Sequence, residues 1–384
     1  METEDIVELA KKEFFWFHRH PELSEEEFET TKRVKTVLGS HGIVTVPLSL
    51  KTGTVVQLGN GNGPVVALRC DMDALPIQEE TGLPYASEIP GKMHGCGHDF
   101  HTATLLGIAL TLKDVPIDGT VKLVFQPAEE NAAGALSILK TGVLDDVDVI
   151  FGLHCSAVYP RGTIITRPGF MNGAVDTFRI TFSGKGAHAC RPYQSIDPVV
   201  MSAQYVTAAQ TVVSRNLNPF HAALVSITHI EAGKTDNVIP ASGFVEGTVR
   251  TLDPGDRKHI RKRLETMAIF IAESFGGEAV IHWHEGPPAT NNTEKWVEFA
   301  KQIAGTLKLP FAPAPDSLSG EDFAFYQQTI PGAFIQIGTG ISPMNHNPAF
   351  RVDPETLHES IAFGSALVLA ALEKLKKKRG QGSD

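Results

Sequence analysis

The sequence has little cysteine, and it lacks any apolar run that approaches the roughly 20 residues of a membrane-spanning helix. Only four cysteines occur in 384 residues, and they are widely separated along the chain. The first five residues are acidic and polar, where a signal peptide would be basic and then apolar. These features predict a cytoplasmic protein without a membrane segment, whose cysteines are reduced thiols rather than disulfides.

The sequence also lacks an excess of positive charge. Its formal net charge is -10, and its one basic run, at residues 374–379, comes at the end of the chain after an expected helix. Proteins that bind nucleic acid need cationic side chains to neutralise phosphates, so the charge argues against this class. The basic run itself is expected to be a solvated terminus.

Size and composition predict a globular protein of two domains. Hydrophobic residues make up 42% of the chain and charged residues 20%, which is enough apolar surface for a core. The length exceeds that of a usual single domain. Ser24-Glu25-Glu26-Glu27 has the pattern of a capping box, which would open a helix that ends near Gly39 or Gly42.

Strands and helices alternate in the first part of the chain. Apolar and β-branched runs predict strands at residues 54–58, 65–70, 121–125 and 147–153, and helices between them at 102–112 and 132–140. This alternation predicts an α/β fold in which a mixed, largely parallel sheet is sandwiched by helices.

The order of elements changes between residues 174 and 285. Strands are expected at 175–183, 223–230, 244–252 and 279–283, with helices at 198–213 and 256–274. The resulting order, β-α-β-β-α-β, is the split pattern of ferredoxin-like units, which fold compactly on their own. We therefore expect a first domain of residues 1–173 and 286–384, with a second domain of residues 174–285 inserted into it.

The segment MHGCGHDFH concentrates a thiol, three imidazoles and a carboxylate. Cys96 and His98 are separated by one glycine, and glycines on both sides of Cys96 permit a backbone that turns both side chains toward one ion. We expect these two residues to bind a metal. His94 and His101 are expected to be structural. Asp99 is expected to begin the following helix, or to orient a metal-binding imidazole through a hydrogen bond without binding the metal itself.

Acidic pairs follow two of the expected strands, where open α/β sheets bind ligands. Asp71 and Asp73 come after one strand, Glu129 and Glu130 after another, and His154 ends a third. Adjacent glutamates repel unless cations lie nearby, so this pair indicates metal ions, with one carboxylate binding metal and the other moving a proton. One of the two aspartates is expected to hold a metal-binding histidine or a glutamic acid in place. Asp73 is expected to be catalytic, and Asp71 to contact the ligands without binding the metal itself. The pattern predicts a metal-dependent hydrolase.

Six motifs are spread over nearly the full length of the chain: LRCDMDALP at 68–76, HGCGHD at 94–99, QPAEE at 126–130, GAHA at 186–189, NVIP at 237–240 and HNP at 346–348. In this order they resemble the metal-dependent amidohydrolases that include hippurate hydrolase, bacterial aminoacylases and plant auxin-conjugate hydrolases, which are related to glutamate carboxypeptidase. The resemblance implies a catalytic α/β domain and an inserted lid domain through which two copies form a homodimer.

The resemblance also implies a role for individual residues. Two divalent metal ions, zinc, manganese, nickel or cobalt, would be bound by Cys96, His98, Glu130, His154 and His346. Glu129 would be the general base for the attacking water. His188 would reach across from a partner subunit's lid to stabilise the oxyanion. Arg250 and Asn237 would hold the α-carboxylate of the substrate.

The expected reaction is hydrolysis of the amide bond of a small N-acyl amino acid, with an acetyl, benzoyl or similar acyl group, to a carboxylic acid and a free amino acid. A dipeptidase, a carboxypeptidase or an N-acetyl-diaminopimelate deacetylase remains open within the same class. A different class would use Cys96 as a nucleophile paired with His98 or His154, and it would not need a metal. The third alternative is a binding protein without catalysis, against which the complete set of expected ligands and Glu129 argue.

Overall fold

The computed structural model describes residues 2–380, which form two compact units. The first unit contains the chain up to Gly169, Asn291–Pro315 and the chain from Asp322 onward. The second unit contains Phe170–Thr290 and Asp316–Glu321. The expected domain boundaries fall a few residues from these positions, and residues 316–321 pack with the second unit although they were expected in the first domain.

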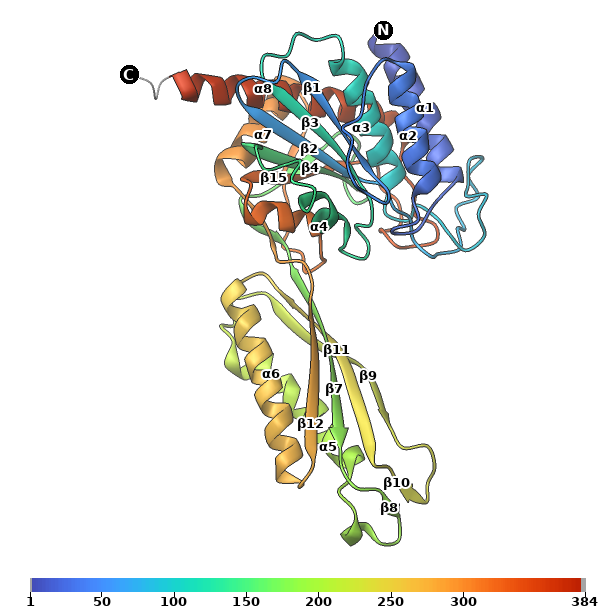
Figure 1. The fold of residues 1–384 in the computed structure, drawn as a ribbon, viewed down its shortest axis with the longest axis vertical. Coiled ribbons are helices and arrows are strands. Elements are labelled where there is room, and N and C mark those ends of the chain that lie inside the picture. The colour runs from blue at the N-terminus through green and yellow to red at the C-terminus, as the bar shows by residue number, and fades with distance from the viewer. Residues whose placement is uncertain (1, 381–384) are drawn as a thin grey trace. The chain divides into compact units, whose positions relative to one another are not determined.

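The first unit is built on a seven-stranded sheet with the order β1-β3-β2-β4-β15-β5-β14 (Figure 1). Its strands are β1 (Thr54–Gly59), β2 (Val65–Asp71), β3 (Thr120–Gln126), β4 (Val149–Ser156), β5 (Ile164–Thr166), β14 (Phe311–Pro313) and β15 (Gly332–Gly338). Pairing is parallel except between β1 and β3 and between β5 and β15. Because β2, β3 and β4 are buried along their whole length, they appear in the sequence as continuous apolar runs. The expected α/β fold with a largely parallel sheet is confirmed.

Helices cover both faces of this sheet. They are α1 (Thr3–Arg19), α2 (Phe28–Ser40), α3 (His98–Leu112), α4 (Gly134–Leu139), α7 (Glu294–Thr306) and α8 (Leu357–Gly380), with the short 3-10 helices η2 (Asp322–Gln328) and η3 (Pro354–Thr356). In β4, Leu153 lies against α8, while the preceding Gly152 lies against Phe323 of η2. Neighbouring residues of a strand point to opposite faces, so α8 and η2 lie on opposite sides of the sheet. Within residues 2–380, none of the helices combines the length and apolar character that a membrane crossing demands.

The second unit is an antiparallel sheet with two helices. Its four-stranded sheet has the order β12-β7-β11-β9, formed by β7 (Ala174–Ser183), β9 (Ala223–Ala232), β11 (Ser242–Thr251) and β12 (Glu278–Glu285). Helices α5 (Pro198–Asn216) and α6 (Pro254–Ser274) share a core with this sheet, in which Tyr205 and Leu264 are fully buried. The remaining short elements are β6 (Gly169–Asn172), β8 (Ala187–His188), η1 (Pro192–Gln194), β10 (Val238–Ile239) and β13 (Thr290–Asn292). The β-α-β-β-α-β order is ferredoxin-like.

The start of α2 differs from the expected capping box. The helix begins at Phe28, and Glu27 precedes it without making a side-chain cap. The Ser24 hydroxyl instead donates to Asp73 Oδ2 at 2.7 Å. The capping box was therefore wrong, because a carboxylate from a distant strand end binds the hydroxyl.

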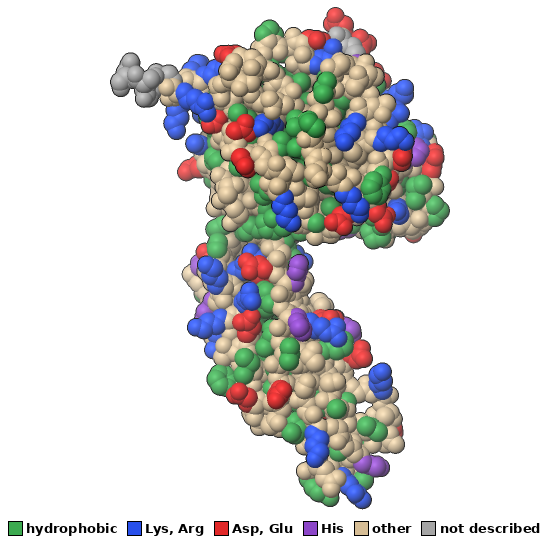
Figure 2. Space-filling view, in the orientation of Figure 1, with side chains coloured by type: hydrophobic (Ala, Val, Ile, Leu, Met, Phe, Trp, Pro, Cys, Tyr) green, Lys and Arg blue, Asp and Glu red, His purple; other side chains and the backbone are tan. Residues whose placement is uncertain are grey.

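The basic run at the end of α8 is partly anchored. Lys376 Nζ lies 2.6 Å from Asp118 Oδ2, and Arg379 Nη2 lies 2.8 Å from Asp148 Oδ1. The expectation of a purely solvated terminus therefore holds only in part. Figure 2 shows acidic and basic side chains interspersed over the viewed face of the molecule.

A buried histidine joins α1 to the first turn of α3. His18 Nδ1 lies 2.6 Å from Asp99 Oδ2, and His18 Nε2 lies 3.2 Å from Glu79 Oε1. Burial disfavours the charged imidazole, but the hydrogen bonds to these two carboxylates outweigh it and raise the pKa of His18 to about 9 from the usual 6.5. The protonated imidazole can donate to both carboxylates, which fixes the start of the helix that carries His98.

We expect His18→Gln to destabilise the protein in a pH-dependent way. Because the folded-state pKa of His18 is raised, its stabilisation is fully present below about pH 6.5 and is lost as the pH rises through about 9. The difference in unfolding free energy between wild type and variant should therefore shrink by about 3 kcal/mol between about pH 6 and about pH 9.5. Urea unfolding at both pH values measures it. The exposed His358→Gln serves as the control, and an equal difference at both pH values would contradict the assignment.

Candidate metal and catalytic site

The loop before α3 presents Cys96 and His98 side by side. His98 is the first residue of the helix, and Gly97 between the two has a φ of 80°. A Cβ at Gly97 would lie 2.5 Å from Cys155 Sγ, so both the conformation and the space require glycine. The thiol and the imidazole thereby reach the same point, as the spacing of the motif predicted.

Glu129 and Glu130 lie in a turn directly after β3. The preceding Ala128 has a φ of 52°, a left-handed conformation that is unfavourable for a residue with a Cβ. The N–H groups of Glu129 and Glu130 donate to Asp73 Oδ1 and Oδ2 at 3.1 and 3.0 Å. The same Oδ1 lies 3.2 Å from His98 Nδ1. Both oxygens of the buried Asp73, which was expected to be catalytic, thus bind the turn, and one of them also binds His98.

The other two expected ligands come from β4 and from the loop before η3. His154 Nδ1 donates to the carbonyl of Cys155 at 2.7 Å, which leaves Nε2 at 3.5 Å from Cys96 Sγ. His346 has a φ of 66°, its N–H donates to the carbonyl of Gly95, and its Nε2 lies 3.4 Å from Glu130 Oε1. Residues from four separate segments of the first unit therefore meet at one place.

The donor atoms at this place are suited to a metal. His98 Nε2 and Glu130 Oε1 are buried, make no hydrogen bond and lie 3.9 Å apart, and the only ion-pair neighbours of this oxygen among the described residues are His98 and His346. Cys96 Sγ lies within 4.8 Å of both. Buried polar atoms are normally hydrogen-bonded, so lone pairs that converge without a donor indicate a cation site. Thiolate, imidazole and carboxylate together are a donor set of zinc and related divalent ions.

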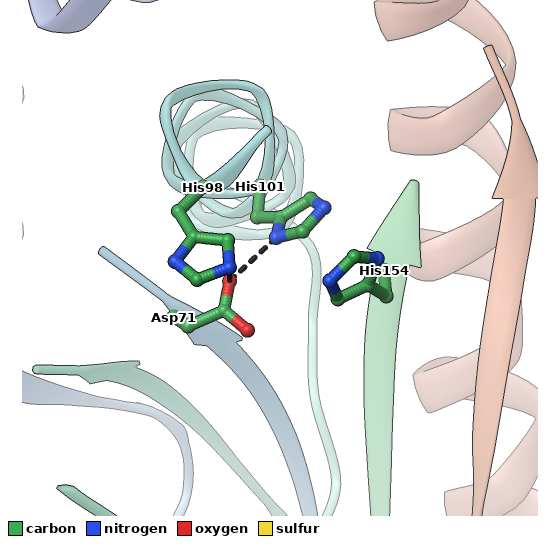
Figure 3. A group of neighbouring side chains, drawn as sticks. All are labelled: Asp71, His98, His101 and His154. Atoms are coloured by element: carbon green, nitrogen blue, oxygen red, sulfur yellow. Dashed lines mark hydrogen bonds and ion pairs between the residues drawn. The ribbon is translucent and has the colours of Figure 1, made fainter. Parts of the chain in front are cut away.

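His101 is excluded from the ligand set by its own hydrogen bonds. It belongs to a second group of neighbouring side chains, Asp71, His98, His101 and His154 (Figure 3). His101 Nδ1 binds the Asp71 carboxylate, and Nε2 accepts the N–H of Cys155 at 2.7 Å. Both ring nitrogens are therefore used, and the residue is structural, as expected.

The Cys96 thiol is held in its ionised form. Burial opposes ionisation, but the imidazoles of His154 and His98 keep the pKa of Cys96 well below its usual value. A thiolate is the form that binds metals, and also the form that acts as a nucleophile. The nearby Glu130 carboxylate distinguishes the two chemistries, because it has no role in a cysteine–histidine pair and is a natural metal ligand.

The second unit carries the three residues expected to contact substrate. His188 in β8 is exposed and pairs across from Val238 in β10, next to the exposed Asn237. Arg250 is half-buried near the end of β11, where it pairs with Val175. Since β10 precedes the start of β11, Asn237 and Arg250 lie at opposite ends of this strand. The structure does not bring these two residues together within one chain.

Several residues at the site gave no local signal. The amide of Asn345 donates to Cys96 Sγ at 3.2 Å. Asp99 lies in the first turn of α3, as one of its two expected roles requires, and its Oδ2 binds His18 rather than an expected metal ligand. Arg69 is fully buried beside Asp71 and Asp322. A charged residue within the apolar run of β2 was the one available hint that such a buried network exists.

Comparisons with known proteins agree with this site. Residues 67–372 match peptidase family M20/M25/M40. An N-acetyl-L-cysteine deacetylase of Bacillus subtilis is 43% identical over 349 residues, which cover 90% of this chain and 84% of the relative. An IAA-amino acid hydrolase of Arabidopsis thaliana is 39% identical over 386 residues, which cover 95% of this chain and 88% of the relative.

A solved structure shares the fold of the whole chain. The crystal structure of a Bacillus subtilis protein, described as a dinuclear metal-binding peptidase from the M20 family, matches with a TM-score of 0.87 at 38% identity. The match covers 96% of this chain and 99% of that one. The resemblance inferred from the six motifs is thereby confirmed. The chain belongs to peptidase family M20/M25/M40 and is a metal-dependent amidohydrolase.

Proposed function

We propose that this enzyme hydrolyses the amide bond of N-acyl amino acids, releasing a carboxylic acid and a free amino acid. The observation that carries the proposal is the convergence of His98 Nε2 and Glu130 Oε1, buried atoms that make no hydrogen bond, with the Cys96 thiolate, next to Glu129. The names of the bacterial and plant relatives, a deacetylase of an N-acetyl amino acid and a hydrolase of IAA-amino acids, support this substrate class.

Five residues of the first unit would hold two divalent metal ions: Cys96, His98, Glu130, His154 and His346. Bound there, such ions would polarise the substrate carbonyl and acidify a water. Glu130 is suited to ligation because its Oε1 lies among the imidazoles of His98 and His346. Zinc, nickel, cobalt and manganese are the candidates, with the thiolate favouring the softer ions.

Glu129 would act as the general base. Its backbone N–H is fixed by Asp73 beside the ligand His98. From this position the carboxylate would accept the proton of the attacking water and later deliver it to the leaving amine. Because Glu130 would bind the metal, Glu129 is the carboxylate of the pair that can accept and deliver a proton.

Metal dependence and the two glutamates can be tested together. We expect a chelator to abolish hydrolysis of N-acetyl and N-benzoyl amino acids, and added zinc, manganese, cobalt or nickel to restore it. Glu129→Gln should keep its metal content but lose about 10²- to 10⁴-fold in kcat, because only the base is removed. Glu130→Gln should lose metal as well. Metal analysis and steady-state kinetics measure both.

The outcome that would reverse this assignment is equally specific. Activity that survives chelation would favour the Cys96 nucleophile, for which Glu129 has no function. The matched surface control is Glu298→Gln in α7, which is exposed and should behave as wild type.

We further propose that His188 completes the site of a partner subunit, in a homodimer formed through the second unit. His188 is exposed in β8, where it pairs with Val238 of β10, and this exposure supports a role toward another chain. Its imidazole would stabilise the oxyanion of the tetrahedral intermediate.

A mixing experiment tests this arrangement. His188→Ala and Glu129→Gln homodimers should each be nearly inactive, whereas mixed dimers combine an intact Glu129 with an intact His188 at one of their two sites. We therefore expect activity to return when the two variants are dissociated and reassembled together. A mixture that stays inactive, although mass spectrometry shows mixed dimers, would place His188 within its own chain's site or outside catalysis.

Arg250 and Asn237 are proposed to hold the substrate carboxylate. Because they lie at opposite ends of β11, a site that uses both would draw them from two chains. Arg250→Ala should raise KM for N-acetyl amino acids by about 10-fold or more, since a charge-assisted bond to the carboxylate is lost, and should change KM for the corresponding amino-acid amides much less. Equal effects on acids and amides would remove Arg250 from this role, and Asn237→Ala is tested in the same way.

A further inference from the structure

We propose that Glu27 is a positioning residue that holds the backbone turn at Ala128 and thereby sets where the Glu129 carboxylate lies. The inference rests on the role proposed for Glu129. It assigns a function to a residue that lies outside all six motifs, in the segment just before α2.

Glu27 is a buried carboxylate surrounded by hydrogen-bond donors. Its side chain is fully buried, Oε1 accepts the N–H of Ala128 at 2.8 Å and that of Glu25 at 3.1 Å, and Oε2 accepts the hydroxyl of Thr52 at 2.7 Å. Burial raises the pKa of Glu27 to about 6, so the carboxyl is mostly ionised at neutral pH. A buried carboxylate is unfavourable unless it is well bonded, and here the bonds converge on the turn before Glu129.

The turn needs to be held. Ala128 has the left-handed φ of 52°, which a residue with a Cβ adopts only when its surroundings impose it. Its carbonyl accepts the N–H groups of Ala133 and Gly134 at 3.2 and 2.9 Å. The N–H of Ala128 is the group that Glu27 binds, so Glu27 holds the strained residue itself.

Packing does not supply the same restraint on the outer side of the turn. A cavity of about 580 Å³ lies there, lined by Pro47, Thr52, Pro127, Ala128 and Lys140 among others. Since packing leaves space beside Ala128, its hydrogen bond to Glu27 adds a restraint on the turn to those that Asp73 makes.

Glu27 and Asp73 hold the turn in different ways. Asp73 binds the N–H groups of both glutamates and the ligand His98, so its loss would disturb the metal site as a whole. Within the turn, Glu27 binds only Ala128. Glu130 would remain held by the ligand cluster when Glu27 is lost. Glu129 would keep its bonds to Asp73 and to the N–H of Asp322, but its carboxylate would shift with the loosened turn. The expected signature is therefore a fall in kcat without loss of metal.

The test compares Glu27→Gln with Glu13→Gln. Glu13 is also a buried glutamate of the first unit, but it binds Arg33 at 2.7 and 2.8 Å and does not touch the turn. Hydrogen exchange of the metal-free proteins, read by mass spectrometry on peptides that cover residues 127–134, reports the turn directly. Kinetics and metal analysis of the metal-loaded proteins report the consequence for catalysis.

We expect Glu27→Gln to speed exchange at residues 127–134 and to lower kcat by about 10- to 100-fold, with KM and metal content close to wild type. Glu13→Gln should change neither the exchange of this peptide nor kcat. If Glu27→Gln does not fold, Thr52→Val removes one donor to the same carboxylate and should give the same changes on a smaller scale.

Two results would overturn the inference: unchanged exchange in the turn, or wild-type kcat in folded, metal-loaded Glu27→Gln. A uniform fall in stability with normal kcat would show that the residue is merely structural, which also overturns it. Wild-type protein that binds metal but hydrolyses no N-acyl amino acid would instead refute the proposed function, and the exchange measurement would then decide by itself whether Glu27 holds the turn.

Discussion

The site depends on the buried carboxylate of Asp73. Three segments that are distant in the sequence donate to it: the Ser24 hydroxyl, the imidazole of His98 at the start of α3, and the N–H groups of Glu129 and Glu130. Burial would raise its pKa, but the bond to His98 and the other donors keep the pKa below the usual value, so the group stays charged. One anion thus fixes the helix that presents the thiol and imidazole relative to the turn that presents the carboxylates.

A second buried charge belongs to Arg69, which lies in the same chain segment as Asp73. Arg69 in β2 is fully buried, with Nη1 2.7 Å from Asp71, Nη2 2.6 Å from Asp322, and Nε donating to Gln126 at 2.8 Å. A buried cation is tolerated only when its donors are matched by anions and acceptors, and removal of one partner is strongly destabilising. The guanidinium therefore ties the carboxyl ends of β2 and β3 to η2, on the edge of the sheet where the ligands lie.

How much of this could be predicted depended on the distance between partners in the sequence. Cys96 and His98 are one glycine apart, so the proximity of their donor atoms follows from local geometry. Ser24 was misread as a helix cap because its true partner, Asp73, is 49 residues away. Glu27 was assigned to the same cap, and His18 gave no signal, since their partners Ala128 and Asp99 lie 101 and 81 residues away. A hydrogen bond between such positions exists only after the sheet has formed.

The sequence by itself determined the types of candidate metal-binding side chain, the buried strands and the β-α-β-β-α-β order, because these depend on residues within a few positions of one another. Tertiary structure decided which groups meet. The spacing of Asp71 and Asp73 did not say which imidazole each would bind, yet Asp71 binds His101 and Asp73 binds His98. That choice follows from how α3 packs across the strand ends, and packing between elements is not encoded in the spacing of either element alone.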